Sequence, residues 1–242
     1  MITVIIPALN EVSCIGQTLE TLLAAKGDFE VLVVDGESSD ATRDIAVRYY
    51  RVLTSSPGRA AQMNRGAEEA QGDVFLFLHA DVLFPSSGIL AIERALSDLK
   101  IPGGNFDVVY EGESFVSRIF TLINRWRRPF GIFYGDSGIF VRREIFDRLG
   151  GFRLLPLMED YDFARRLVRA GKTTCLADSL IVSARRWEEH GLWRTMATWF
   201  FFHVLFYSGL PMQSLARHYP PIRRQLAPSP ASLEPAQLPF RR

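Results

Sequence analysis

One stretch decides the fold: Gly72-Asp73-Val74-Phe75-Leu76-Phe77-Leu78-His79-Ala80-Asp81. Its unbroken run of Val, Phe and Leu is typical of a strand that is covered on both faces, as in a parallel sheet. The run stops at His79 and Asp81, and ligands of open α/β sheets bind beyond the carboxyl ends of the strands. We therefore expect a functional site at these two residues. Taken alone, the stretch is also compatible with a strand followed by an Asx-type turn.

The composition fits one large globular domain. With 242 residues, of which 48% are hydrophobic, the chain can form one α/β domain, alone or with a short appendage. Lys and Arg number 28 and Asp and Glu 27, so the net charge of +1 gives no reason to expect nucleic-acid binding. Cys14 and Cys175 lie far apart without metal-ligand spacing, which argues against a zinc site or a disulfide framework and favours a cytoplasmic setting. The segment Met1–Pro7 predicts a first strand rather than a signal peptide.

Strand and helix patterns alternate in the first eighty or so residues. The predicted strands are Thr3–Ile6, Val31–Val34, Arg51–Leu53 and the opening stretch. The predicted helices carry Ile15, Leu19, Leu22 and Leu23, then Ile45 and Ala46 after a cap at Ser39 or Asp40, then Arg59–Ala70. This order implies right-handed crossovers and a Rossmann-like, mostly parallel sheet. The loop after the first strand is Pro-Ala-Leu-Asn-Glu rather than GxGxxG, which argues against a dinucleotide-dependent dehydrogenase.

The pattern changes in the second half, which we expect to be mixed α+β and continuous with the first. A helix is predicted over residues 85–99, and Gly103-Gly104-Asn105 then precedes the alternating run Phe106–Tyr110, which looks like an antiparallel or edge strand. Further helices are predicted with an apolar face over residues 115–126, up to Leu149 before Gly150-Gly151, and from Met158 to Gly171. The expected fold is thus α/β with a small antiparallel part.

The C-terminal part differs from the rest. Residues 192–210 are rich in Trp, Phe and Tyr, but Arg194 and His203 interrupt a run that is already short of the roughly 20 apolar residues of a membrane span. Packing against the domain or a second subunit competes with a membrane-surface role. Residues 219–242 hold six of the 13 prolines and predict disorder. The expected units are a domain over 1–187, an aromatic helical extension over 188–218 and this tail.

Polar groups follow three of the predicted strands and should meet at one sheet edge. Asn10 and Glu11 follow the first strand, Asp35 and Ser38 the second, and Asp81 the fourth. An Asp after the second strand can accept a hydrogen bond from a base N–H or a ribose hydroxyl, with the Pro7-Ala8 backbone beside the same nucleoside. Asp81 can hold a divalent cation that bridges two phosphates. Arg59 and Asn64 could contact ribose or diphosphate, although Arg59 also reads as a solvated charge at a helix start.

Four separated motifs carry a family resemblance. They are Pro7-Ala8-Leu9-Asn10-Glu11, Val34-Asp35-Gly36-x-Ser38-x-Asp40, His79-Ala80-Asp81 and Glu159-Asp160. Over about residues 2–187 the chain resembles the family 2 inverting glycosyltransferases of the GT-A fold. Three further segments are similar to the branch of radical-SAM/selenodomain-associated, or arsenosugar-biosynthesis, glycosyltransferases: residues 58–64, 77–81 and 183–187.

The resemblance implies a nucleotide-diphosphate sugar as donor, a UDP-sugar being favoured over a GDP-sugar, and a divalent cation, Mn²⁺ or Mg²⁺, on Asp81. The donor-nucleotide residues it implies are Pro7, Ala8, Asn10, Glu11, Asp35, Gly36, Ser38, Arg59, Asn64, His79 and Ala80. The chain departs from the family pattern at His79, which replaces the first Asp of the metal motif, and at Glu37 and Ala41, which replace residues that are often glycine. Coordination of the metal, a hydrogen bond to ribose and simple packing are all open for His79.

The resemblance also implies that Asp160 is the base that takes the acceptor proton. A carboxylate at a helix N-terminus has a structural explanation as well, because it can cap the helix. The candidate acceptor residues are Gly104, Tyr134, Asp136, Glu159, Arg186 and Trp187. The Arg-Arg-Trp segment could clamp a diphosphate or form a surface ion pair beside a buried indole.

We therefore expect a metal-dependent inverting glycosyltransferase that acts by single displacement on a small or lipid-linked acceptor. The expected place is the cytoplasm, with peripheral contact at the inner membrane face or a homodimer through 192–210 as further options. A sugar-phosphate nucleotidyltransferase is the rival enzyme, but it would need a Gly-rich basic loop after the first strand. A non-catalytic nucleotide-sugar-binding or membrane-associated scaffold is the other rival, and it would need neither Asp81 nor Asp160.

Overall fold

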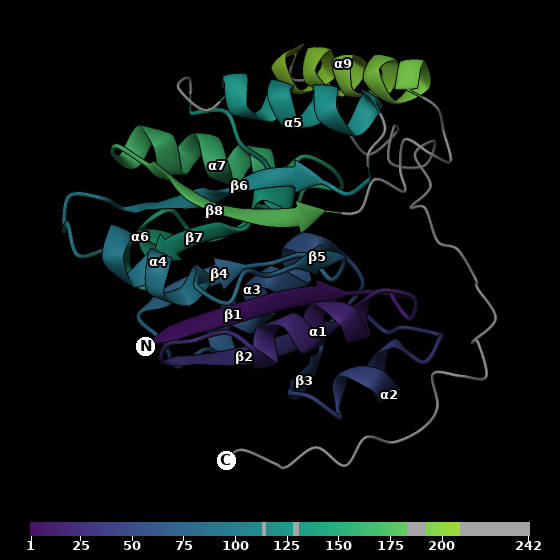
Figure 1. Ribbon diagram of the computed structural model, residues 1–242, viewed down its shortest axis with the longest axis vertical. Coiled ribbons are helices and arrows are strands. Elements are labelled where there is room, and N and C mark those ends of the chain that lie inside the picture. Colours follow the sequence, from purple (N-terminus) through teal and green to yellow (C-terminus); the bar gives the residue numbers. More distant parts are fainter. Residues whose placement is uncertain (113–114, 128–130, 183–191, 209–242) are drawn as a thin grey trace.

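The computed structural model describes residues 1–112, 115–127, 131–182 and 192–208. An eight-stranded sheet with the strand order β3-β2-β1-β4-β7-β6-β8-β5 forms the middle of the molecule, and helices cover both of its faces (Figure 1). The predicted tail over 219–242 and the segment 183–191, which holds Arg186 and Trp187, lie outside the described residues.

The N-terminal half forms the parallel part of the sheet, as the sequence predicts. Its elements are β1 (Ile2–Ala8), α1 (Ile15–Leu23), β2 (Phe29–Asp35), α2 (Thr42–Ala46), β3 (Arg51–Thr54), α3 (Arg59–Glu69) and β4 (Val74–Phe77). β1 pairs in parallel with both β2 and β4, and β2 pairs in parallel with β3. The opening stretch is therefore the buried central strand β4, and the α/β class with a mostly parallel sheet is confirmed.

The second half adds the antiparallel part. Its elements are β5 (Val82–Leu83), α4 (Gly88–Ala95), β6 (Gly103–Tyr110), α5 (Phe115–Arg127), η2 (Gly135–Ser137), β7 (Ile139–Arg142), α6 (Arg143–Arg148), α7 (Glu159–Ala170), β8 (Thr174–Val182) and α9 (Leu192–Ser208). β7 is antiparallel to β4 and β6, and β5 is antiparallel to β8. The sequence patterns predicted no strand at β5, β7 or β8.

The strand expected at Phe106–Tyr110 is part of β6, and of the two alternatives for it, antiparallel pairing occurs with β7, whereas an edge position was wrong. β6 lies inside the sheet, antiparallel to β7 and parallel to β8, and nearly all of its residues are buried. The physical reason for the interior position is that β6 begins with two glycines, Gly103 and Gly104. A Cβ on Gly104 would lie 1.9 Å from the Thr174 carbonyl oxygen and 2.9 Å from the Phe140 ring, so only glycine lets both neighbouring strands approach.

Two apolar layers flank the sheet. On one face, alternate residues of β1 (Ile2, Val4, Ile6 and Ala8) pack against α1, α4 and Phe120 of α5. On the other face, Ile5 of β1 and Phe75 and Phe77 of β4 pack against α3, α6 and α7. The alternation follows from the two-residue period of a strand, and it explains why the opening stretch needs apolar residues at every position.

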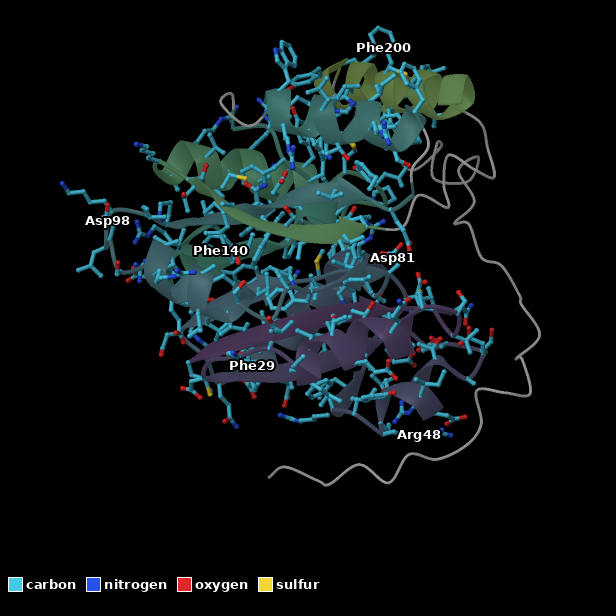
Figure 2. All side chains as sticks on the ribbon, viewed as in Figure 1. Phe29, Arg48, Asp81, Asp98, Phe140 and Phe200 are labelled. Atoms are coloured by element: carbon cyan, nitrogen blue, oxygen red, sulfur yellow. The ribbon has the colours of Figure 1, made fainter. Side chains whose placement is uncertain are left out.

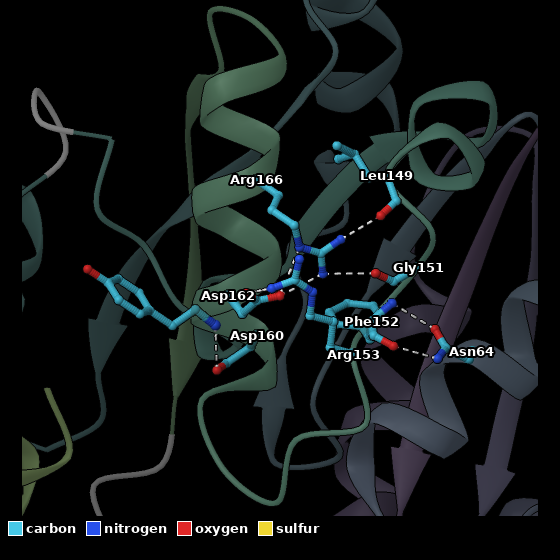
Figure 3. Close-up of polar contacts among 9 residues, drawn as sticks. Asn64, Leu149, Gly151, Phe152, Arg153, Asp160, Asp162 and Arg166 are labelled. Atoms are coloured by element: carbon cyan, nitrogen blue, oxygen red, sulfur yellow. Dashed lines mark hydrogen bonds and ion pairs between the residues drawn. The ribbon is translucent and has the colours of Figure 1, made fainter. Parts of the chain in front are cut away.

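Polar contacts fasten α7 to the rest of the second apolar layer (Figure 3). Asn64 of α3 donates through Nδ2 to the Phe152 carbonyl at 2.8 Å and accepts from the Phe152 N–H at 2.9 Å. Asp162 binds Arg166 at 2.8 Å, and the Arg166 guanidinium also donates to the carbonyls of Leu149 and Gly151. These contacts hold the turn before α7, and therefore the start of α7, against α3.

The aromatic helix α9 packs on its own domain, next to α5 (Figure 1). The rings of Phe120 and Trp199 meet edge to face with centroids 5.6 Å apart, and Phe206 meets Tyr161 of α7 at 5.4 Å. Of the helices in the described ranges, none combines the length and apolar character that crossing a bilayer requires.

We predict that Gly104→Ala destabilises the fold by about 3 kcal/mol, at the upper end of what overpacking costs, because the added methyl meets a backbone carbonyl that cannot rotate away. The matched control is Gly16→Ala in α1, whose Cβ would lie in ordinary contact 3.6 Å from Ile45 and should be neutral or stabilising. Urea unfolding followed by circular dichroism measures both. Equal midpoints for the two variants would show that β6 tolerates a side chain at this position.

Candidate functional site

The carboxyl ends of β1, β2 and β4 bring the predicted residues to one edge of the sheet. Ala8 and Asp35 are direct partners in the β1–β2 register, and the Gly36 N–H donates to the Ala8 carbonyl at 2.9 Å. β4 ends beside β1, and His79, Ala80 and Asp81 follow at the same edge, where Figure 2 labels Asp81. The Ala80 carbonyl is fixed by the buried Thr18 hydroxyl at 2.7 Å. This convergence was predicted from the strand order.

Asp35 is buried with an incomplete set of partners. One oxygen, Oδ2, accepts the Ser38 N–H at 3.2 Å. The other, Oδ1, is buried and has no hydrogen-bond partner among the described residues. An unsatisfied buried acceptor costs about 1–3 kcal/mol, so this position suits a donor group on a ligand, such as a base N–H or a ribose hydroxyl.

The loops after β1 and β2 are fastened to each other. The Asn10 N–H donates to Ser38 Oγ at 3.0 Å, and Asn10 Oδ1 accepts the Ser39 N–H at 2.8 Å. The Glu11 N–H donates to the buried Thr42 hydroxyl at 2.7 Å. Asn10 and Ser38 thus shape the rim beside Asp35, and their direct contact with a nucleotide stays a prediction.

Strained backbone gathers at the same loops. Among the described non-glycine residues, positive φ angles occur at Asn10 (56°), Glu37 (65°) and Met158 (64°). Such residues cost about 1–3 kcal/mol each and cluster at functional sites. Asn10 and Glu37 follow β1 and β2, and Met158 immediately precedes Glu159 and Asp160. All three therefore lie in segments that the sequence motifs single out.

Gln62 was missed as a site-forming residue. Its side chain is buried on α3 and donates at 2.8 Å to the carbonyls of Ala8 and Val34, so it ties the ends of β1 and β2 together. A Cβ on Gly36 would lie 2.9 Å from the same amide, which explains the glycine after Asp35. The sequence feature that could have identified Gln62 is its position as a polar residue on the buried face of a predicted helix.

Arg59 and Glu159 link the starts of α3 and α7. Arg59 Nε lies 3.2 Å from Glu159 Oε1, and only 3% of the Glu159 side chain is exposed. Burial raises the pKa of Glu159, and the positive charge of Arg59 acts against that rise. Arg59 is therefore more than a solvated helix-start charge, because it neutralises a buried carboxyl next to Asp160.

His79 lies among charged groups of both signs. Burial and the neighbouring Arg59 lower its pKa, while the carboxyl groups of Asp81, Asp160 and Asp136 act in the opposite direction. The net lowering of the pKa favours the neutral imidazole, in which one ring nitrogen carries a lone pair that can bind a cation. Burial raises the pKa of Asp136, whose Oδ2 accepts the Tyr110 hydroxyl at 2.8 Å.

Asp160 is held by two backbone N–H groups. Its Oδ2 accepts the Gly135 N–H at 2.8 Å and its Oδ1 the Tyr161 N–H at 2.7 Å (Figure 3 draws the second). A Cβ on Gly135 would lie 2.8 Å from His79 Nε2 and 2.9 Å from Asp160 Oδ2, so glycine leaves both side chains room at one point. Asp160 is in the first turn of α7, but the N-cap position belongs to Met158 and carries no side-chain cap. Simple capping does not account for the Gly135 contact.

Some residues that were predicted to contact a ligand instead make structural contacts or lie away from the sheet edge. Asn64 uses both amide groups on the Phe152 peptide, and Gly104 lies within the sheet rather than in a loop at the edge. Tyr134 stacks on Tyr161 beside Asp160, with centroids 5.2 Å apart. Roles for these residues in ligand binding stay predictions.

The described residues do not enclose a metal ion by themselves. Over the described ranges, no group of three or more His, Cys, Asp and Glu side chains is arranged to hold one. Asp81, with the neutral His79 two residues before it, offers a partial donor set. That set fits a cation such as Mg²⁺, which usually takes one or two protein carboxylates and completes its shell with phosphate oxygens and water.

Solved structures with low sequence identity share this fold. Staphylococcus aureus TarS (residues 1–349, in complex with UDP-GlcNAc) superposes with a TM-score of 0.62 and 17% identity, over 75% of this chain and 58% of that one. The mannosyltransferase PcManGT from Pyrobaculum calidifontis, in complex with GDP-Man and Mn²⁺, gives a TM-score of 0.60 and 21% identity, over 74% and 56%. The architecture is thus the GT-A fold.

Sequence relatives agree with the fold. A PGL/p-HBAD biosynthesis glycosyltransferase of Mycobacterium bovis is 31% identical over 180 residues, which cover 67% of this chain and 68% of that protein. The probable glycosyltransferase YdaM of Bacillus subtilis is 27% identical over 201 residues, 70% of this chain but 47% of that protein, so the chain spans about half the length of this relative. The sequence profile described as glycosyl transferase family 2 matches residues 3–150, more than half of the chain. The chain therefore belongs to glycosyl transferase family 2.

Proposed function

We propose that this protein transfers a sugar from a nucleotide-diphosphate sugar to an acceptor hydroxyl by single displacement, with inversion at the sugar C1. The observation that carries the proposal is the placement of Asp160. Two backbone N–H groups hold its carboxylate beside His79, at the sheet edge that also presents Asp81 and the incompletely partnered Asp35. Nucleotide recognition, phosphate neutralisation and proton removal thus each have a candidate group at one edge.

In the proposed reaction Asp160 takes the proton from the acceptor hydroxyl. The hydroxyl oxygen forms a bond to C1 of the sugar while the bond from C1 to the diphosphate oxygen breaks, and the nucleoside diphosphate leaves with that electron pair. The hydrogen bonds from Gly135 and Tyr161 fix the direction of the carboxylate, which is the orientation that a base needs. Glu159 is paired with Arg59, so it does not add an unpaired charge beside the base.

A divalent cation, Mn²⁺ or Mg²⁺, is part of the proposal. The carboxylate of Asp81 would hold it, and His79 could supply a nitrogen. A bound cation would stabilise the charge that develops on the departing diphosphate. The complex of PcManGT with GDP-Man and Mn²⁺ supports cation use in this fold.

As the donor we propose a UDP-sugar rather than a GDP-sugar. TarS is described in complex with UDP-GlcNAc and with UDP, and PcManGT with GDP-Man, so the fold accepts both bases. We also propose that the chain belongs to the arsenosugar-type branch, on the motif resemblance at residues 58–64, 77–81 and 183–187. A sugar-phosphate nucleotidyltransferase lacks support because residues 7–11 offer no Gly-rich basic loop. A scaffold would not need Asp160 to be held by two backbone donors.

The helices α5 and α9 suggest a peripheral membrane contact. Phe115, Leu122 and Trp126 of α5 are exposed. Together with the exposed Arg118 they are spaced three or four residues apart, so the four side chains form one stripe along the helix. Phe200, Phe201, Val204 and Tyr207 of α9 are exposed as well, and Figure 2 shows Phe200 at the outer side of the molecule. Aromatic residues interleaved with Arg are typical of helices that lie in the membrane interface.

Charge favours a membrane over a second copy of the chain. Neither α5 nor α9 contains Asp or Glu, and α5 exposes Arg118 beside its apolar residues, whereas Arg125 is paired with Asp107 at 2.9 Å. Two copies that met through this face would bring like charges together, which is unfavourable. Anionic lipid headgroups would complement the same charges, and a lipid-linked acceptor would then reach the enzyme at this surface. We accordingly place the protein in the cytoplasm, peripheral at the inner membrane face.

We predict that Mn²⁺-dependent binding of a nucleotide is lost in Asp81→Asn. Calorimetric titration with UDP, GDP and CDP, each with and without Mn²⁺, measures it, and tight binding of UDP by the unaltered protein is the expected result. The matched control is Asp73→Asn at the opposite end of β4, where the side chain is 90% exposed. Metal-dependent binding that survives in Asp81→Asn would remove Asp81 from the cation site.

Asp160→Asn should keep nucleotide binding and lose transfer by about 10²–10⁴-fold in kcat, because the amide cannot accept the acceptor proton. Release of UDP from a UDP-sugar, together with the calorimetric Kd for UDP, separates the two effects. Asp147→Asn on α6 changes an exposed carboxyl and serves as control. Parallel losses of binding and transfer in Asp160→Asn would count against its role as base.

We also predict that the protein sediments with vesicles of phosphatidylcholine and phosphatidylglycerol, and that added salt weakens the binding. Trp126→Ala and Phe200→Ala, which truncate side chains that are 69% and 72% exposed, should each reduce the bound fraction. Leu99→Ala removes an apolar side chain that is 84% exposed in the loop before β6, and should leave binding unchanged. A concentration-dependent dimer with no vesicle binding would instead favour a contact between two copies.

A further inference from the structure

We propose that α9 is a positioning element of the active site, which holds Asp160 in place through Tyr134 and Tyr161. This inference rests on the proposed function, because it assumes that Asp160 is the base. α9 (residues 192–208) lies beyond residues 3–150, which match the family profile, so the profile does not account for it. Three successive layers of contacts lead outward from the Asp160 carboxylate to α9.

The first layer is the pair of backbone donors. Asp160 Oδ2 accepts the N–H of Gly135, which follows Tyr134 directly, and Asp160 Oδ1 accepts the N–H of Tyr161. The two donors come from segments that are separate in the sequence, η2 and α7. The direction of the carboxylate therefore depends on how these two segments are placed relative to each other.

The second layer is the ring pair that joins the segments. The rings of Tyr134 and Tyr161 stack with centroids 5.2 Å apart and an interplanar angle of 20°. Tyr161 is buried, and burial raises the pKa of both phenols, so the two hydroxyls stay protonated and can donate. A shift of either ring would shift a backbone N–H that holds Asp160.

The third layer is α9, which binds both phenol groups. His203 Nε2 lies 2.8 Å from the Tyr134 hydroxyl, and the Tyr207 hydroxyl lies 2.7 Å from that of Tyr161. His203 Nδ1 lies 2.7 Å from the Trp199 carbonyl of the same helix. A carbonyl only accepts, so Nδ1 carries a proton, and in the neutral imidazole Nε2 is then the acceptor for the Tyr134 O–H.

These contacts are more specific than apolar packing. Packing of α9 on α5 needs only rings such as Trp199 against Phe120. His203 instead interrupts the aromatic run of the helix and is matched in distance and tautomer to Tyr134, one residue before the Gly135 donor. A loss of this contact should therefore affect the chemical step more than donor binding, because Asp35 and Asp81 belong to other elements.

The variants for the test are His203→Phe, which removes the acceptor for Tyr134, and His203→Gln, whose carbonyl can replace it. Tyr207→Phe removes only one hydroxyl, so it remains informative if His203→Phe fails to fold. Met196→Ala changes a side chain of the same helix that is 40% exposed and lies seven residues before His203, and it is the control. Circular dichroism of the full chain establishes that each variant is folded.

The first measurement is hydrogen–deuterium exchange at the Gly135 and Tyr161 amides, which needs no substrate. We expect faster exchange in His203→Phe and Tyr207→Phe, recovery in His203→Gln and no change in Met196→Ala. The second measurement is release of UDP from UDP-glucose with Mn²⁺. We expect kcat to fall about 10–10²-fold in His203→Phe with KM unchanged, and to recover in His203→Gln.

Unchanged exchange at both amides would overturn the inference, and so would faster exchange with an unaltered kcat. A rise in KM without a change in kcat would also overturn it, since it would place α9 in donor binding. If the unaltered protein neither binds UDP nor releases it from UDP-glucose, the proposed function fails for this donor. The exchange result then still decides whether α9 holds the two amides.

Discussion

The shared edge at which β1, β2 and β4 end is the constraint on which the rest of the structure depends. Parallel pairing of β1 with β2 and β4 requires crossover helices, and it brings Ala8, Asp35 and the segment after Phe77 to the same side of the sheet. Gln62 reinforces this edge by donating to the carbonyls of Ala8, the last residue of β1, and Val34, the residue before the end of β2. The antiparallel β7 then starts next to the end of β4, and it thereby places η2, with Gly135, beside His79. The chemistry of the site is assembled by this geometry rather than by one continuous motif.

Local patterns predicted the parallel half of the sheet and not the second half, for a physical reason. A fully buried strand such as β4 shows an apolar run that no turn or surface helix would have, so its place was evident from residues 74–78. β7 and β8 contain polar residues, among them Arg142 and Ser179, and these residues are satisfied by distant partners: Arg142 by the Leu96 carbonyl and Ser179 by Asp107. Such strands are stabilised by tertiary contacts that a local pattern does not contain. The same limit explains why β6 looked like an edge strand, since the close approach of Thr174 to Gly104 is not visible in the sequence.

The candidate site divides in the same way. Residues that follow strands, such as Asp35 and Asp81, could be predicted because the strand order alone places them. Residues that act through partners far along the chain could not. Asn64 was predicted as a ligand contact, yet its amide serves the Phe152 peptide, 88 residues away in sequence. His203 was noted only as an interruption of an aromatic run, although its Nε2 meets the phenol of Tyr134, 69 residues earlier.

The composition of α9 is consistent with a helix that has tasks on both of its sides. A helix that packs on one face normally carries charged residues on the other, but α9 is apolar or aromatic around much of its circumference. Its inner side meets Phe120, Tyr134 and Tyr161, and its outer side exposes Phe200 and Val204. If the outer side enters a membrane interface, the same helix links that event to Tyr134 and Tyr161, and through them to the Gly135 and Tyr161 N–H groups that bind Asp160. Binding energy gained at the lipid surface would then order the base, so membrane contact and proton removal would be coupled through one element.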